Sequence, residues 1–160
     1  MAVGSLSNNI ISMKNSNPGP RIISTWKHGV PANKIAWERL KKGEGGLTAV
    51  EYGVRDSEDN PDERSVGYGG LPDREGKVTL DACIMDKNND CGAVSFLQNI
   101  KNPISVARLV MEKTPHVMLS GKGAYDFAIK NGFKSMNLLT EKSKKDWENW
   151  LKKSEYKPVI

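Results

Sequence analysis

Apolar residues in the first third of the chain follow spacings that predict one short strand and then two helices. Residues 21–25, RIIST, are a β-branched run typical of a strand. From Pro31 the apolar residues recur at helical spacing as far as Gly43, which predicts a first helix. Leu47, Val50 and Val54 continue this spacing as a second helix. It is expected to stop at Asn60-Pro61, because the residue before proline avoids helical backbone.

The middle of the chain changes to a period of two. Apolar and polar residues alternate over residues 78–84, residues 86–90 are rich in turn formers, and CGAVSFL at 91–97 can return as a second strand. This pattern predicts an antiparallel hairpin. Just before it, RSVGYGG at residues 64–70 places three glycines in four positions. Glycine costs backbone entropy, so such a cluster indicates that the backbone approaches something closely.

The last third returns mostly to helical spacing. The elements expected are a helix capped by Asn102 with Pro103 in its first turn and closed by Pro115, a strand at 116–119, a helix at 123–130 closed by Asn131-Gly132, and a helix at 140–153. Trp147, Trp150 and Leu151 are the expected buried stripe of the last helix. Helices first, strands in the middle and helices last predict a layered α/β (α+β) arrangement.

Composition narrows the class of protein. At 160 residues the chain is about one domain long, and its charged fraction of 27% is close to that of globular proteins. No apolar run approaches the roughly 20 residues that cross a membrane, so we expect no membrane partner. The net charge is +5, but 24 basic and 19 acidic residues are interspersed. This pattern favours a solvated surface, and we expect no nucleic-acid partner.

The N-terminal segment and the cysteines say little about the compartment. Residues 1–20 are rich in Ser, Asn, Gly and Pro and lack the charge and apolar pattern of a signal peptide, so we expect a flexible leader. Residues 21–160 form the expected domain. Cys83 and Cys91 are too few for a disulfide framework and are expected to be buried thiols, although pairing across the hairpin stays open.

Several kinds of chemistry are excluded by missing motifs. The glycine cluster is not a phosphate-binding loop, because no Gly-Lys-Ser/Thr follows it, and no dinucleotide fingerprint joins a strand to a helix. His28 and His116 stand apart, and the cysteines lack zinc spacing, so we expect no metal and no cofactor. No nucleophile elbow of a serine hydrolase is present.

Three carboxylates remain as candidates from the residues alone. Asp73 and Asp86 are expected to be turn residues. Asp81 lies within a strand pattern, where its charge must be paired or exposed.

Three long segments nevertheless resemble one family closely. They are STW at 24–26, RSVGYGGLPDREGKVTLDACIMD at 64–86 and IKNPISVARLVMEKTPHVMLSGKGAYDFA at 100–128. In this order they resemble the α-chain of the glycosylasparaginase (aspartylglucosaminidase) family, whose members are N-terminal nucleophile hydrolases. The resemblance covers roughly residues 21–160. The SVGYGG loop of this sequence, residues 65–70, differs from the loop found in the neighbouring asparaginase and isoaspartyl-peptidase branch.

The resemblance implies both a fold and a reaction. The fold would be half of a four-layer αββα sandwich, and a β chain cut from the same precursor would complete it. Two such pairs of chains would form an (αβ)2 heterotetramer. The reaction would be hydrolysis of the amide between asparagine and N-acetylglucosamine in glycoprotein degradation. The nucleophile would be the threonine at the start of the β chain, activated by its own amino group. No catalytic residue is therefore expected in this chain, which should be inactive alone.

The resemblance also implies site residues. Trp26 matches a tryptophan that lines the substrate pocket, and Ser65 matches a serine near the substrate; a core aromatic and a turn hydroxyl are the alternatives. His28 stands where relatives carry phenylalanine, and is expected to change the polarity of the pocket. Thr48 replaces a usual aspartate.

Other interpretations stay open at this stage. The chain ends at YKPVI, before the segment where the family cleaves. A subunit of the isoaspartyl peptidase/L-asparaginase type and a non-enzymatic truncated half are the alternatives to a glycosylasparaginase subunit. The resemblance suggests a periplasmic or lysosomal protein, whereas the lack of a signal-peptide pattern suggests a cytoplasmic one. The compartment is therefore left undecided.

Overall fold

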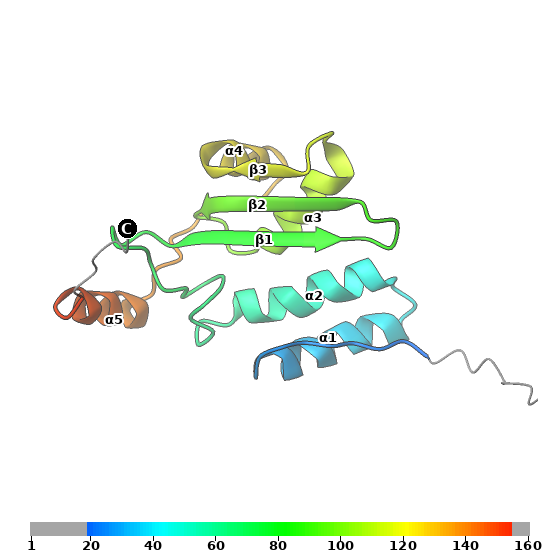
Figure 1. The fold of residues 1–160 in the computed structure, drawn as a ribbon, viewed down its shortest axis with the longest axis horizontal. Coiled ribbons are helices and arrows are strands. Elements are labelled where there is room, and N and C mark those ends of the chain that lie inside the picture. Colours follow the sequence, from blue (N-terminus) through cyan, green and yellow to red (C-terminus); the bar gives the residue numbers. More distant parts are fainter. Residues whose placement is uncertain (1–18, 155–160) are drawn as a thin grey trace, which may run out of the picture.

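The structure, a computed structural model, describes residues 19–154. In chain order its elements are α1 (Gly29–Lys41), α2 (Gly46–Asp59), β1 (Thr79–Met85), β2 (Cys91–Gln98), α3 (Pro103–Lys113), β3 (Met118–Ser120), α4 (Gly121–Lys130) and α5 (Glu141–Leu151) (Figure 1). Apart from Gly19 and Pro20, the expected leader lies outside the described residues. None of the described helices is long and apolar enough to span a membrane.

The strands form a small mixed sheet in the order β1-β2-β3. β1 and β2 are antiparallel, which confirms the predicted hairpin, and β3 pairs parallel to β2 after the crossover through α3. The mixed α/β class predicted from the sequence is therefore confirmed. The predicted helices are present with ends shifted by a few residues, and the expected third strand begins at Met118 instead of His116.

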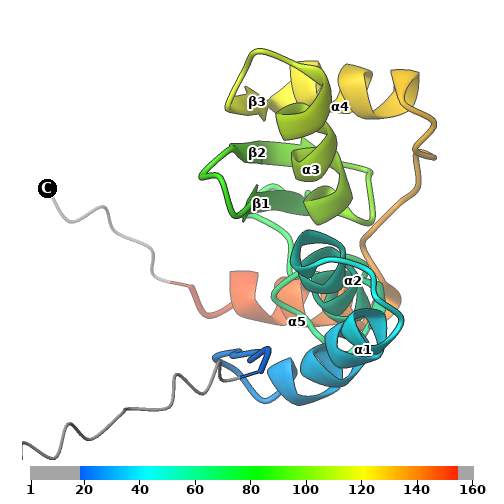
Figure 2. The ribbon, with the colours of Figure 1, turned by 90° about the vertical axis from the view of Figure 1, so that its right-hand side faces the viewer.

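Helices α3 and α4 lie on the same side of the three strands (Figure 2). Between the helices and the sheet lies the main core, in which Ala82 and Ile84 of β1 and Val94 and Leu97 of β2 meet the apolar faces of both helices. Its buried members are Ile84, Val94, Leu97, Ile100, Ile104, Val106, Ala107, Val110, Ala124 and Ala128. This packing is what the period of two in the strands and the helical spacing after Pro103 require.

The opposite face of the sheet is open. Met85 of β1 is 60% exposed and Met118 of β3 is 56% exposed. Cys83 of β1 pairs with Ala93 of β2, which pairs with Met118 of β3. The side chains of Cys83, Ala93 and Met118 therefore lie in one row on this face. Apolar side chains therefore lie on a sheet surface that the described residues leave in contact with solvent.

A β-bulge interrupts the hairpin opposite Asp81. The register changes between Leu80 and Ala82, and Phe96 takes a φ of 52°. The Asp81 carboxylate accepts the backbone N–H of Phe96 at 2.8 Å. The side chain of Asp81 is also exposed to solvent. The expectation that this charge is paired or exposed is therefore confirmed, since it is hydrogen-bonded and exposed at once.

The two other candidate carboxylates close turns, as expected. Asp73 accepts the N–H groups of Glu75 and Lys77, and Asp86 accepts those of Asn88 and Asp90. They have structural roles that account for their positions.

Two expectations about local structure are wrong. Residues 21–25 form no strand, because this segment lies over α1 and α2 and no strand within residues 19–154 pairs with it. Trp150 and Leu151 are not a buried stripe, since they are 47% and 38% exposed, and Trp147 is only half-buried. The buried residue of α5 is Ser143, whose hydroxyl donates to the carbonyl of Gly69. A short polar contact to the glycine loop thus anchors this helix.

The cysteines are unpaired but not buried. Cys83 is exposed and Cys91 is half-buried. The expectation of buried thiols is wrong because both residues belong to the open face of the hairpin, where Cys91 lies opposite Met85.

Candidate functional site

The glycine loop approaches the end of α2. Gly67 has a φ of 55°, and a Cβ added there would lie 2.0 Å from the carbonyl oxygen of Glu58. The next residue, Tyr68, donates its N–H to the same carbonyl at 2.8 Å. Only glycine allows this approach. The close neighbour that the sequence indicated is therefore helix backbone.

Ser65 stands at the start of this loop, exposed, on the wall of a hollow of about 340 Å³. The hollow lies between the end of α2, the glycine loop, β1 and the first turn of α3. Its polar groups come from Glu58, Ser65, Thr79, Asp81 and Cys83. The serine hydroxyl therefore lies beside space that a small polar molecule can enter.

Trp26 precedes α1 in a tight turn, in which its carbonyl accepts the N–H of Gly29 at 2.8 Å. Its side chain is 73% exposed, which excludes the alternative of a core aromatic within the described residues. Trp26 does not line the hollow beside Ser65. An exposed indole at a fixed turn fits a residue whose contacts come from outside the described part of the chain.

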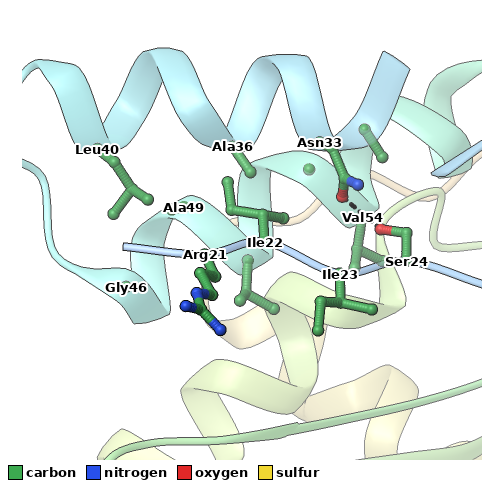
Figure 3. Close-up of a pocket in the computed structure, with 13 residues that line it drawn as sticks. Arg21, Ile22, Ile23, Ser24, Asn33, Ala36, Leu40, Gly46, Ala49 and Val54 are labelled. Atoms are coloured by element: carbon green, nitrogen blue, oxygen red, sulfur yellow. Dashed lines mark hydrogen bonds between the residues drawn. The ribbon is translucent and has the colours of Figure 1, made fainter. Parts of the chain in front are cut away.

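The segment before Trp26 is held by the helix pair (Figure 3). Ile22 is half-buried and lies beside Ala36 at a hollow of about 270 Å³, whereas Ile23 is 91% exposed. Ser24 donates to the Asn33 amide oxygen. Most of the side chains around this hollow are apolar and none is titratable except Arg21. We therefore assign it to anchoring of the segment and not to chemistry.

His28 connects the two parts of the candidate site. Its Nδ1 lies 2.9 Å from Oε2 of Glu63, and both side chains are about three-quarters buried, with 26% and 28% exposed. Trp26 is two residues before this histidine and Ser65 two residues after this glutamate. The structure thus brings together the STW segment and the glycine loop, although it shows no contact between Trp26 and Ser65 themselves.

Glu58 is a residue of this region that the sequence reasoning missed. It is only 2% exposed. Its Oε1 accepts the N–H of Ile104 at 3.0 Å and its Oε2 accepts the Asn102 side-chain amide at 3.3 Å. Asn102 occupies the N-cap of α3, as predicted, but it makes no capping bond of its own. The carboxylate of Glu58 satisfies the helix N-terminus instead.

Burial raises the pKa of Glu58 from 4.5 to about 7, against the lowering effect of its bonds to Ile104 and Asn102. The sequence did carry a signal for this residue. Glu51 and Glu58 are seven apart on α2, and both are buried, whereas Val50 and Val54, which predicted the helix, are 51% and 37% exposed. Of the three residues that predicted this helix, Leu47 does pack against the main core, so the apolar positions show only part of the buried face.

The side chains around Ser65 and Trp26 are suited to forming the walls of a binding pocket. In residues 19–154 no three His, Cys, Asp or Glu side chains cluster as a metal would require. Ser65 and Trp26 offer a hydroxyl and an aromatic surface, and His28 and Glu58 hold the segments that carry them. Thr48, at the start of α2, accepts a hydrogen bond from Arg108 at 3.1 Å, so it belongs to the contact between α2 and α3.

Comparison with known proteins gives one consistent result. The family model described as asparaginase matches residues 21–159. The chain is 62% identical over 141 residues to an N(4)-(β-N-acetylglucosaminyl)-L-asparaginase of Elizabethkingia miricola, covering 88% of this chain and 42% of that protein. It is 42% identical over 143 residues to the protein of the same name from Rattus norvegicus, covering 89% of this chain and 41% of that protein. The chain thus spans about two-fifths of the length of these relatives.

Proposed function

Because the chain belongs to the asparaginase family, we propose that it forms the α part of an amidohydrolase that cleaves N(4)-(β-N-acetylglucosaminyl)-L-asparagine. The remaining length of the relatives would correspond to a β part that carries the catalytic threonine. The threonine hydroxyl would attack the side-chain amide carbonyl, and the amine of the sugar would leave. Water would then hydrolyse the resulting ester to release aspartate.

The observation that carries this proposal is the open face of the sheet, taken with the 62% identity. Met85 and Met118 are each more than half exposed on this face. Apolar surface of this kind on a sheet face is typical of an interface. A second sheet from the β part would cover it and complete the four-layer sandwich, and a pair of such heterodimers would form the (αβ)2 assembly.

The α part would contribute walls of the pocket. Trp26 would present its indole to the sugar or the aspartyl group, and Ser65 would offer a hydroxyl to the substrate or to an ordered water. His28 would hold the two segments together through Glu63 and add polarity beside the indole. These roles agree with the exposure of Trp26 and Ser65 and with the anchoring of the segments that carry them.

A substrate comparison tests the proposal. The full-length protein is incubated with N(4)-(β-N-acetylglucosaminyl)-L-asparagine, with L-asparagine and with a β-aspartyl dipeptide, and released aspartate is measured. We expect the glycoasparagine to be hydrolysed with the highest kcat/KM. Preference for the dipeptide or for asparagine would support the isoaspartyl peptidase/L-asparaginase alternative, and no hydrolysis of any of the three would support the non-enzymatic one.

A further inference from the structure

We propose that Glu58 is the positioning residue of the Ser65 loop, which it holds against the N-terminus of α3. The inference rests on the proposed function in one respect only, the role of Ser65 at the substrate. The positioning itself concerns contacts within this chain.

The backbone of Glu58 holds the loop. Its carbonyl accepts the N–H of Tyr68 at 2.8 Å, and Gly67 lies so close that no other side chain fits. On the far side of the loop, Gly69 donates to the carbonyl of Leu138 at 2.9 Å. Ser65 is two residues before Gly67, so the position of its hydroxyl depends on where the Glu58 carbonyl lies.

The side chain of Glu58 holds that carbonyl in place. The carboxylate accepts the N–H of Ile104 at 3.0 Å and the amide of Asn102 at 3.3 Å, which ties the last turn of α2 to the first turn of α3. Asn102, the N-cap of α3, and Ile104 in its first turn are both buried, and Ile104 belongs to the main core. Asp59 also accepts the Asn102 amide, at 2.8 Å, but Glu58 is the residue that both bonds to the start of α3 and meets the glycine loop.

A nearby residue offers a matched comparison. Glu51 is also a buried carboxylate of α2 that binds α3, through the Ser105 hydroxyl and through Arg108 at 2.8 Å. It lies two helical turns before Glu58 and is absent from the hollow beside Ser65. Both glutamates join α2 to α3, but only Glu58 reaches the glycine loop.

The charges around Glu58 make this contact sensitive to its ionisation. Asp59 and Arg55 act on it from α2, with Lys101 paired to Asp59 at 2.9 Å, and Asp81 of β1 lines the same hollow. Its bonds to Ile104 and Asn102 are strongest when the carboxyl is ionised. Because burial brings its pKa to about 7, protonation near neutral pH weakens the link between loop and helix.

The test compares the full-length wild-type protein with Glu58→Gln and Glu51→Gln. Hydrogen exchange is followed by mass spectrometry in peptides covering residues 64–71, and kcat and KM for N(4)-(β-N-acetylglucosaminyl)-L-asparagine are measured from pH 5.5 to 8.5. We expect Glu58→Gln to exchange faster in this loop, to raise KM by roughly tenfold with a smaller change in kcat, and to remove the pH dependence of KM around 7. We expect Glu51→Gln to leave loop exchange and KM as in the wild type.

Two results would overturn the inference: loop exchange unchanged in Glu58→Gln, or raised equally in Glu51→Gln. The exchange measurement does not need activity. If the wild type fails to hydrolyse the substrate, the proposed function fails, and the exchange rates still decide whether Glu58 positions the loop.

Discussion

Nδ1 of His28 lies 2.9 Å from Oε2 of Glu63, and this contact joins two segments that are far apart in the sequence. One segment carries Trp26 and the other carries Ser65. Both side chains are about three-quarters buried, so the contact is neither a core pair nor a freely solvated one. We infer that it sets the spacing between the aromatic and hydroxyl walls of the proposed pocket.

A double-mutant cycle tests that spacing. His28→Phe and Glu63→Gln should each raise KM of the full-length protein about two- to fivefold, because pairs of this exposure contribute at most about 1 kcal/mol. The double variant should be no worse than the more affected single variant, since the second change removes a contact already lost. Strictly additive effects would show that the two side chains act independently.

The packing of Gly67 on Glu58 predicts a large cost for any side chain there. Gly67→Ala and Gly43→Ala both force alanine into a positive φ, at 55° and 77°. That strain alone costs about 1–2 kcal/mol. At Gly43 the added methyl meets nothing within 4 Å, whereas at Gly67 it would overlap the Glu58 backbone. We expect Gly67→Ala to lower the free energy of unfolding by roughly 1–3 kcal/mol more than Gly43→Ala.

Denaturant unfolding of the two glycine variants measures this difference. An equal loss of unfolding free energy in Gly67→Ala and Gly43→Ala would mean that the loop moves away from α2 without cost. The close approach of Gly67 to Glu58 would then have no energetic importance.

The burial of Glu58 predicts how stability depends on pH. Its pKa is about 7 in the folded protein against an ordinary 4.5, so between these values the folded state keeps a proton that the unfolded chain has released. The free energy of unfolding therefore falls as pH rises from about 4.5 to 7, by at most about 3 kcal/mol from this group. Glu58→Gln cannot titrate and should lack this component.

The measurement is the difference in unfolding free energy between Glu58→Gln and wild type at several pH values. The free energy of unfolding of the variant, relative to that of the wild type, should increase from pH 4.5 to 8. The contributions of other titrating groups cancel in this difference. A difference that stays constant with pH would show that Glu58 keeps an ordinary pKa in the fold.

The open sheet face predicts the reactivity of a thiol. Cys83 is exposed on this face in the described chain, in the same row as Ala93 and Met118. If a second sheet covers the face in the full-length protein, Cys83 should react with a thiol reagent on the order of tenfold or more slowly in the native protein than in urea. A Cys83→Ser variant assigns the signal. Equally fast labelling in both conditions would mean that nothing covers the face.

The sequence predicted the regular elements well and the exposed positions poorly. Alternation over residues 78–84 and Pro103 after Asn102 correctly predicted the hairpin and α3, because local spacing decides these elements. The β-branched run at residues 21–25 failed as a strand, because a strand depends on a partner that local spacing does not reveal.

The candidate site shows the same limit. The glycine cluster correctly indicated a close backbone contact, but the identity of the neighbour, Glu58, depends on tertiary packing. Glu58 itself was missed because acidic residues are rarely buried, and only the fold shows that it satisfies the N-terminus of α3. Trp26, Ser65 and His28 came from the resemblance, and their roles at the substrate stay predictions.

The central claim is that this chain is one half of a two-chain amidohydrolase. Mass spectrometry of the protein purified from its native host tests it most directly. We expect two co-purifying chains, one containing residues 21–154 and a second that begins with threonine, in a complex that releases N-acetylglucosamine from N(4)-(β-N-acetylglucosaminyl)-L-asparagine. A chain that purifies without such a partner and does not act on this substrate would contradict it.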